Sequence, residues 1–320
     1  MLDLKSLKVV LAVAELGNMT AAGRRLGLTQ SAVSQAVRQL EESLGAVLIA
    51  RERRPLALTA AGVALRERGA ALMAEAETLF RSVREQAGNQ AQLLRLGMVD
   101  SFAATVGPPL VQHLLASAVQ IHVASGLAPG LGASLLERRL DVIVTTDPPP
   151  PAASTIALDR HPVLSERYVL LLPKALAKGR SHVAPPLSEL SARLPMVRFN
   201  RDSHIGAQVD EYLRAAGLAP PNRLQIDTAD SLVAMVAGGL GWSLITPLCL
   251  LQARADPRTV AALSLPDGGL AREFSLVARR GEYGGLPQSM ARHAAEIFRT
   301  RLQPQLARLA PWLVEAVSVG

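Results

Sequence analysis

A chain of 320 residues is too long for one ordinary core, so its length predicts two or three domains. About half of the residues are apolar (49%) and a fifth are charged (19%), which excludes a largely disordered chain. The formal net charge of +7 favours a polyanionic partner such as nucleic acid, although a basic composition also suits a merely soluble protein.

The cysteine content and the apolar pattern bear on the compartment. Cys249 is the single cysteine, which excludes an intramolecular disulfide and a metal site made of cysteines alone. Charged residues interrupt the apolar stripe of the N-terminus, so it is not a signal-peptide core, and no run of about 18 uncharged apolar residues follows. We therefore expect a cytoplasmic protein without a membrane span.

The first fifty residues are predicted to form three helices. Apolar residues recur three and four positions apart over residues 4–14, and again over 32–44. A shorter helix over 21–26 lies between them, and Thr29 is a favourable N-cap for the third helix. Each helix is followed by a glycine, the usual residue at a helix C-terminus. The pattern is helix, short turn, helix.

A wing and a long helix are predicted next. Arginines alternate with apolar residues after position 48, and Pro55 disfavours a continuous helix, so two short strands are expected. Residues 60–90 contain no proline and carry a leucine-rich stripe on one face of a helix. Such a helix needs a partner, most simply the same helix of a second chain. The predicted dimerisation residues are Leu65, Leu72, Met73, Leu79 and Phe80.

The remainder of the chain reads as an α/β body. From residue 91, short apolar strands alternate with helical segments, an order typical of βαβ units and a parallel sheet. A proline run at 148–151 separates a first set of strands from a second, and a short tail helix is expected to end in AVSVG. Helices are predicted over 109–117, 131–139, 208–216, 230–237 and 287–302.

Three stretches carry a specific resemblance. A helix-turn-helix pattern alone is shared by plain three-helix bundles, which stay an alternative at this point. The stretches are LAVAELGNMTAAGRRLGLTQSAVSQAVRQLEESLGAVLIARERRPLALTAAG, GLAPGLGASLLERRLDVIV and LVAMVAGGLGWSLITP. In this order they resemble the LysR-type transcriptional regulators over nearly the whole chain. Departures such as Gly23, where the family usually has Ala, and Ser31, where it usually has Pro, put the base preference in doubt but not the fold.

The resemblance implies a domain organisation. It predicts an α/β protein with an N-terminal all-α winged helix-turn-helix and a C-terminal body similar to periplasmic binding proteins, made of two α/β subdomains. It also implies homodimers that pair into homotetramers, and a small effector in the body that alters DNA binding. The expected parts are a DNA-binding domain 1–59, a dimerisation linker helix 60–90, and an effector-binding regulatory domain 91–320, with subdomain I at 91–163 and 264–320 and subdomain II at 164–263.

The outer face of the third predicted helix is expected to read double-stranded promoter DNA. The second helix of a helix-turn-helix enters the major groove, where Gln, Ser and Arg side chains can bond base edges. Arginines of the preceding helix and of the wing are expected on phosphates. A solvated helix face is the plain alternative. The predicted DNA-binding residues are Thr20, Arg24, Arg25, Thr29, Gln30, Ser31, Ser34, Gln35, Arg38, Arg51, Arg53 and Arg54.

Polar residues at the predicted strand ends are candidates for effector binding. Ligands of open parallel sheets lie beyond the carboxyl ends of the strands. Each hydroxyl also fits an ordinary helix cap, whereas Arg201 and His204 on one loop favour an acidic effector. Trp242 either borders this cleft or fills the core. The predicted effector-binding residues are Asp100, Ser101, Phe102, Ser125, Thr145, Thr146, Arg201, Ser203, His204 and Thr228.

Other function classes fit the sequence less well. The six histidines are scattered, and HExxH, CxxC, GxSxG and GxxxxGK[ST] patterns are absent, so no catalytic residue, metal site or cofactor is predicted. A solute-binding protein for transport would need an export signal. A ligand-independent architectural DNA-binding protein is the alternative to an effector-responsive regulator.

Overall fold

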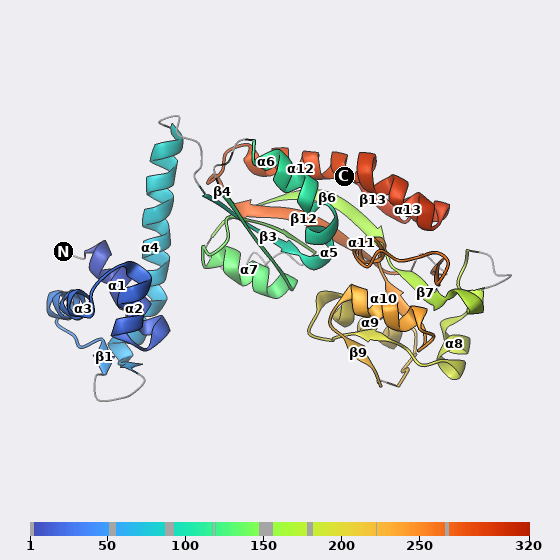
Figure 1. Cartoon of the computed structure of the whole chain (residues 1–320), viewed down its shortest axis with the longest axis horizontal. Helices are drawn as coiled ribbons and strands as arrows, with labels where there is room; N and C mark the ends of the chain where they lie inside the picture. The colour runs from blue at the N-terminus through green and yellow to red at the C-terminus, as the bar shows by residue number, and fades with distance from the viewer. Residues whose placement is uncertain are drawn as a thin grey trace. The chain divides into compact units, whose positions relative to one another are not determined.

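The computed structural model divides the chain into two compact units, Met1–Asn89 and Gln90–Gly320 (Figure 1). Within the long helix of the first unit, the side chains of residues 74, 75 and 77–86 lie outside the description. The described residues are 3–50, 56–86, 93–116, 118, 120–146, 156–177, 182–221, 223–265 and 269–320.

The N-terminal unit contains three short helices, a two-stranded wing and one long helix. Asn18 caps the second helix by accepting hydrogen bonds from the backbone N–H groups of Thr20 and Ala21, so this helix begins two residues earlier than predicted. A glycine in the left-handed conformation ends each short helix, as the sequence predicts. The elements are α1 (Leu4–Leu16), α2 (Met19–Leu26), α3 (Gln30–Leu44), β1 (Ile49–Ala50), β2 (Ala57–Leu58) and α4 (Ala60–Gln86).

One face of α3 is buried and holds the helix in place. Val37 of α3 and Leu7 of α1 belong to one apolar core, in which each fully buried aliphatic side chain contributes about 1.5–3 kcal/mol. The wing is attached to the same helix by Glu41, whose Oε1 accepts hydrogen bonds from the backbone N–H groups of Leu48 at 2.9 Å and Ile49 at 3.3 Å. The opposite, polar face of α3 is thereby left at the surface.

Subdomain I of the C-terminal unit is built on a six-stranded sheet with the order β13-β6-β12-β5-β3-β4. Its strands are β3 (Leu93–Val99), β4 (Gln120–Gly126), β5 (Val142–Thr145), β6 (Leu158–Arg167), β12 (Ala271–Arg279) and β13 (Val317–Val319). Its helices are α5 (Asp100–Thr105), α6 (Gly107–Leu114), α7 (Ala128–Leu136), α12 (Leu286–Ile297), which continues into a π-helical turn (Phe298–Leu302), and α13 (Gln303–Leu309).

Subdomain II has a three-stranded sheet with the order β10-β7-β11 and a two-stranded parallel sheet of β8 and β9. Its strands are β7 (Val169–Pro173), β8 (Arg198–Phe199), β9 (Gln225–Ile226), β10 (Ser243–Ile245) and β11 (Val260–Ser264). Its helices are α8 (Leu187–Arg193), α9 (His204–Ala215), α10 (Ala229–Ala237) and α11 (Pro247–Gln252).

Two predictions about the body are wrong. The large sheet is mixed rather than parallel, because β12 lies antiparallel between β5 and β6. The expected tail helix does not reach AVSVG: Val317 and Val319 belong to β13, which pairs with β6 at the sheet edge. Alternating β-branched residues favour a strand there, and an edge of a sheet was within reach to pair with it.

Helix starts in the body also differ from the prediction. α7 begins at Ala128 rather than at residue 131, and α9 begins at His204 rather than at 208 because Ser203 caps it. The first turn of each helix contains a glycine and lacks a regular apolar period, so the sequence predicted a loop there. The functional consequence is that helix N-termini lie nearer to the strand ends than expected.

Two neighbouring strands carry the chain between the subdomains. β6 of the large sheet leads through Tyr168 directly into β7, and β11 leads back into β12 across residues 265–270. β6 and β12 pair with each other along their whole length (Figure 1). The predicted fold class, an all-α winged helix-turn-helix followed by a two-subdomain α/β body, is confirmed.

Candidate nucleic-acid interface and effector pocket

The surface face of α3 presents the polar residues that the sequence singles out. Gln30, Ser31, Gln35 and Arg38 are exposed and Ser34 is half-buried. Residues three and four positions apart share one side of a helix, so this set forms a single strip. The first turn of α3 contains no acidic residue, which leaves the positive end of the helix dipole available to an anion.

Two threonines of this region have different roles. Thr29 is the N-cap of α3, because its Oγ1 accepts a hydrogen bond from the backbone N–H of Ala32 at 3.2 Å. The Thr29 hydroxyl also bonds to that of Ser31 at 2.9 Å. Thr20 is exposed in the first turn of α2. The cap therefore accounts for Thr29 without any contact to DNA.

The predicted phosphate contacts are placed only in part. Arg24 and Arg25 are exposed near the end of α2, and Arg25 forms an ion pair of 2.7 Å with Glu15. An exposed pair of this kind is weak and can open toward a phosphate. The wing residues Arg51, Arg53 and Arg54 lie outside the described residues.

The leucine stripe of α4 is divided between two environments. Leu65 and Met73 are half-buried and pack against the core of the N-terminal unit, and Gly69 lets α4 approach Leu7 of α1 closely. Leu72 has 44% of its surface exposed. The side chains of Leu79 and Phe80 lie outside the description. The described part of the stripe therefore brings Leu72 alone to the surface as a large apolar side chain.

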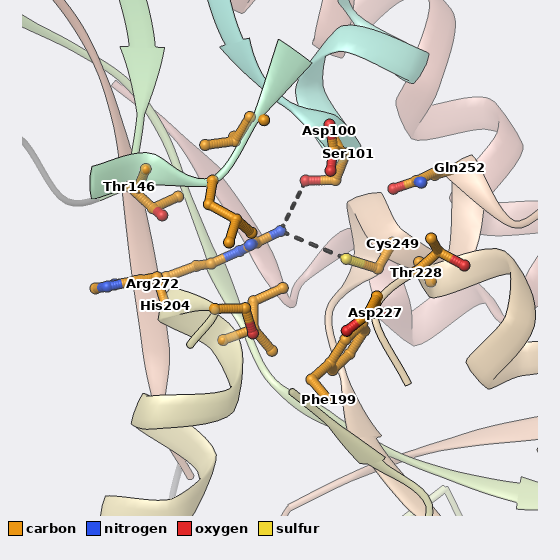
Figure 2. A pocket seen from close by; sticks show the side chains of 17 residues that line it. Asp100, Ser101, Thr146, Phe199, His204, Asp227, Thr228, Cys249, Gln252 and Arg272 are labelled. Carbon is orange, nitrogen blue, oxygen red and sulfur yellow. Dashed lines mark hydrogen bonds between the residues drawn. The ribbon is translucent and has the colours of Figure 1, made fainter. Parts of the chain in front are cut away.

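A pocket of about 520 Å³, counted out to its open mouth, lies in the C-terminal unit (Figure 2). Its walls come from the carboxyl ends of β3, β4, β5, β8 and β9, and its floor from α11 and β12. Six of the ten predicted effector-binding residues line it, namely Asp100, Ser101, Thr146, Ser203, His204 and Thr228.

The other four predicted residues lie elsewhere. Phe102 and Thr145 are fully buried, and Ser125 is exposed beside the pocket's lining rather than in it. Arg201 is 60% exposed, does not line the pocket, and forms an ion pair with Asp210. The two cationic groups of this loop therefore do not act together at the pocket.

Two of the hydroxyl groups that line the pocket cap helices. Ser203 Oγ accepts a hydrogen bond from the backbone N–H of Gly206 at 3.0 Å, and Thr228 Oγ1 accepts one from Ser231 at 3.3 Å. The loops that carry these caps are tied together, because Asn200 Nδ2 donates to Asp227 Oδ1 at 3.0 Å. These hydroxyls position the N-termini of α9 and α10 at the pocket.

Arg272 of β12 is the charged residue at the pocket floor, and sequence reasoning did not find it. Only 4% of its surface is exposed. Its Nε donates to Glu166 Oε1 at 2.8 Å, and its Nη2 donates to Ser101 Oγ at 3.0 Å and to Thr246 Oγ1 at 2.9 Å. The guanidinium also lies over the ring of Phe274. Glu166 stands 106 residues away in sequence, so no local motif reveals this pair.

The electrostatics of this cluster follow from burial and pairing. Burial opposes the charged form of Arg272, but the neighbouring charge of Glu166 outweighs it and raises the pKa of the guanidinium. Burial raises the pKa of the Cys249 thiol, which lies 3.7 Å from Arg272 Nη2. Arg272 therefore stays charged, and Cys249 stays a protonated thiol near neutral pH.

Trp242 fills the core of subdomain II. It is fully buried, and its Nε1–H donates to the backbone carbonyl of Leu194 at 3.2 Å. Of the two placements weighed from the sequence, the core is confirmed. No helix in the described part of the chain is both long and apolar enough to cross a membrane.

Comparisons with known proteins give a consistent result. Residues 4–63 match the family model of the bacterial regulatory helix-turn-helix protein, lysR family, and residues 87–303 match that of the LysR substrate binding domain. The HTH-type transcriptional regulator y4mQ of Sinorhizobium fredii, itself uncharacterized, is 28% identical over 97% of this chain and 94% of its own length. LysG of Mycobacterium tuberculosis is 29% identical over 85% of this chain and 83% of its own.

The fold has solved counterparts. A full-length OxyR variant from Pseudomonas aeruginosa superposes with a TM-score of 0.66 at 17% identity, covering 92% of this chain and 98% of that one. At that identity the likeness concerns the fold alone.

Proposed function

Because the chain belongs to the LysR family of transcriptional regulators, we propose that it binds promoter DNA through the polar face of α3 and that a small molecule in the pocket of the C-terminal unit modulates this binding. The observation that carries the proposal is the exposed strip of Gln30, Ser31, Gln35 and Arg38, opposite the buried side of α3. A helix whose surface served only solubility would not need this hydrogen-bonding set.

The chemistry of the strip fits base-pair edges. Gln bonds adenine at two points and Arg bonds guanine at two points in the major groove, while Ser adapts to either base. Arg24 and Arg25 on α2 fit phosphate contacts, as do the wing arginines, which set register and affinity. The dipole at the start of α3 adds an attraction for the backbone.

Two copies are required for selectivity. One recognition helix reads too few base pairs to distinguish a site in a genome. We propose that α4 pairs with α4 of a second copy through the exposed Leu72 and the apolar residues that follow it, and that the homodimers assemble further into homotetramers. Leu65, which lies seven residues before Leu72 on nearly the same side of the helix, and Met73 pack against the unit's own core instead.

The pocket is suited to a small polar effector. Ser203 and Thr228 fix the starts of two helices there, and Arg272 places a permanent cation at the floor. Arg272 therefore supports an acidic group on the effector, whereas Arg201, one of the two residues that suggested it from the sequence, does not line the pocket. The guanidinium can donate a charge-assisted hydrogen bond to a carboxylate, and the helix N-termini at the pocket add to this attraction.

DNase I footprinting with the purified full chain tests the proposal. The probe is the DNA immediately upstream of the chain's own gene, and the control is the same fragment with its bases scrambled. We expect a protected region on the first fragment alone, with an extent that changes when a metabolite that raises the chain's melting temperature is added. Equal protection of both fragments, insensitive to every such metabolite, would match an architectural DNA-binding protein and contradict the proposal.

A further inference from the structure

One nitrogen of the Arg272 guanidinium, Nη1, makes no hydrogen bond to the described residues that surround it. Nε and Nη2 carry every hydrogen bond that the described residues accept from this guanidinium. The side chain of Arg272 is 3% exposed. Among the described residues, the completely buried polar atoms without a hydrogen-bond partner do not include Nη1, so this nitrogen is not fully enclosed. Arg272 lines the pocket (Figure 2), so Nη1 is the nitrogen of this guanidinium that remains for a hydrogen bond to a ligand.

Helix N-termini strengthen the attraction for an anion at the inner end of the pocket. α7, α9 and α10 are nine to twelve residues long, and their first residues Ala128, His204 and Ala229 line the pocket. Their dipoles favour negative charge, as Arg272 does. The inner end therefore fits a carboxylate.

The acidic residues of the lining point to a second, opposite group on the ligand. Asp100 and Asp227 are exposed carboxylates of the lining. Among the described residues, Asp227 accepts one hydrogen bond, from Asn200, and Asp100 accepts none through its side chain. Glu166 already balances the charge of Arg272, so these two aspartates leave an excess of negative charge that a simple carboxylic acid would increase.

We propose that the effector is a zwitterion of the α-amino acid type, with its carboxylate on Arg272 Nη1 and its ammonium group against Asp100 and Asp227. This inference rests on the proposed function, since it names the ligand of the same pocket. A carboxylate bound to Arg272 would also be connected to residues of both subdomains. Arg272 on β12 holds Glu166 on β6, Ser101 at the start of α5 and Thr246 before α11, so a group bound to Nη1 acts on the residue that connects both subdomains.

The test is calorimetric titration of the full chain with each of the twenty L-α-amino acids. Each amino acid that binds is compared with the carboxylic acid that lacks its amino group and the amine that lacks its carboxyl group. We expect at least one amino acid to bind, and both of its truncated analogues to bind about tenfold or more weakly, because each leaves a charged partner in the pocket unpaired. Binding by none of the twenty, or equal binding by the deaminated acid, would overturn the inference.

Separate variants test the two ends of the ligand. Asp227→Asn is expected to weaken binding of the amino acid but not of its deaminated acid, whereas Asp202→Asn, an exposed aspartate outside the lining, leaves both unchanged. Unchanged amino-acid affinity in Asp227→Asn would contradict the assigned ammonium position.

For the carboxylate end, the paired change Glu166→Gln with Arg272→Gln removes both buried charges together and should abolish binding. If that pair fails to fold, Arg272→Lys, which keeps the charge but loses the guanidinium fork, must still weaken it.

The footprint separates this inference from the proposed function. If only simple carboxylates or neutral compounds bind the pocket and alter the footprint, the proposed zwitterionic ligand is wrong and the proposed regulatory function is supported. If an amino acid binds through Asp227 and Arg272 while no promoter fragment is protected, the ligand class stands and the proposed function fails.

Discussion

Gly62 lies where the first turn of α4 meets the wing. A Cβ atom at this position would stand 2.1 Å from the backbone carbonyl oxygen of Leu48, and that carbonyl also accepts a hydrogen bond from Thr59. The obstacle is backbone, so it cannot move aside as a side chain can. We expect Gly62→Ala to lower the stability of the N-terminal unit by about 1–3 kcal/mol.

Thermal unfolding followed by circular dichroism measures this effect. Gly130→Ala is the control, because Gly130 is a helical glycine of α7 with nothing within 4 Å of its added Cβ. The control should be neutral or more stable by about 0.5–1 kcal/mol, the difference in helix propensity. Equal melting temperatures for Gly62→Ala and the unaltered chain would show that the wing does not pack against α4 as described.

Arg38 is the member of the exposed strip with the greatest capacity to discriminate bases. We expect Arg38→Ala to weaken binding to a cognate duplex by about 1–3 kcal/mol and to leave a scrambled duplex almost unaffected. Arg24→Ala is the matched comparison, and it should weaken both duplexes alike because its expected partner is a phosphate. Fluorescence anisotropy with both duplexes at two salt concentrations provides the measurement. Equal losses on both duplexes from Arg38→Ala would refute base reading by this residue.

His293 of α12 gives stability a dependence on pH. Its ring stacks on that of His113 of α6, with centroids 3.7 Å apart, and burial together with His113 lowers the pKa of His293 below the ordinary 6.5. Nearby Arg301 lowers the pKa further and Glu296 opposes the shift. The folded state therefore holds fewer protons than the unfolded state in the interval just below pH 6.5, and stability falls as the pH drops through it.

Melting temperatures from pH 7.5 to pH 5.0 test this expectation. The variant His293→Gln should lose less stability on acidification than the unaltered chain, and His122→Gln, an exposed histidine of β4, should behave as the unaltered chain does. An identical slope in His293→Gln would exclude His293 as the source.

Among the elements, those whose structure depends on residues close in the sequence were predicted from the sequence. α1, α2 and α3 were predicted because caps, glycines and an apolar period lie within each segment. β13 was predicted as helix because its strand character depends on an edge supplied by β6, about 150 residues earlier. The strand order of the mixed sheet has the same long-range origin.

The residues of the pocket show the same difference between local and long-range signals. Ser203 and Thr228 were found because strand ends and helix caps leave a local pattern, whereas Arg272 depends on a partner on another strand. Thr145 was expected at the pocket and is instead fully buried, because the strand end alone does not reveal which way a side chain points.

α4 is the element through which we propose that two copies of the chain associate. Leu72 is the described large apolar residue on its surface, and Ala70 lies two positions away, about 200° around the helix. We expect Leu72→Glu to shift the chain from dimer or larger toward monomer, since it places a charge in an apolar contact. Ala70→Glu should leave the mass unchanged. Light scattering after size exclusion gives the masses, and a dimer that persists unchanged in Leu72→Glu would exclude this side of α4 as the interface.

At the scale of the whole molecule, the chain combines a surface that we propose reads DNA with a pocket that we propose binds an effector. The N-terminal unit presents a polar strip whose opposite face is buried. The C-terminal unit presents a pocket whose floor comes from α11 and from β12, one of the two strands that connect its subdomains. A ligand that prefers one arrangement of those subdomains shifts the population of that arrangement, and only by its difference in affinity. Paired copies of the chain would carry that shift to paired recognition helices.

Selection of bound sequences from a random duplex library by the full chain tests the central claim, that two copies read base edges through α3. We expect an enriched motif of two half-sites related by two-fold symmetry, with centres about 10 base pairs or a multiple of that apart. We also expect this enrichment to weaken at the base contacted by Arg38 in the Arg38→Ala variant. A library that emerges without sequence preference, or with one isolated half-site, would contradict the claim.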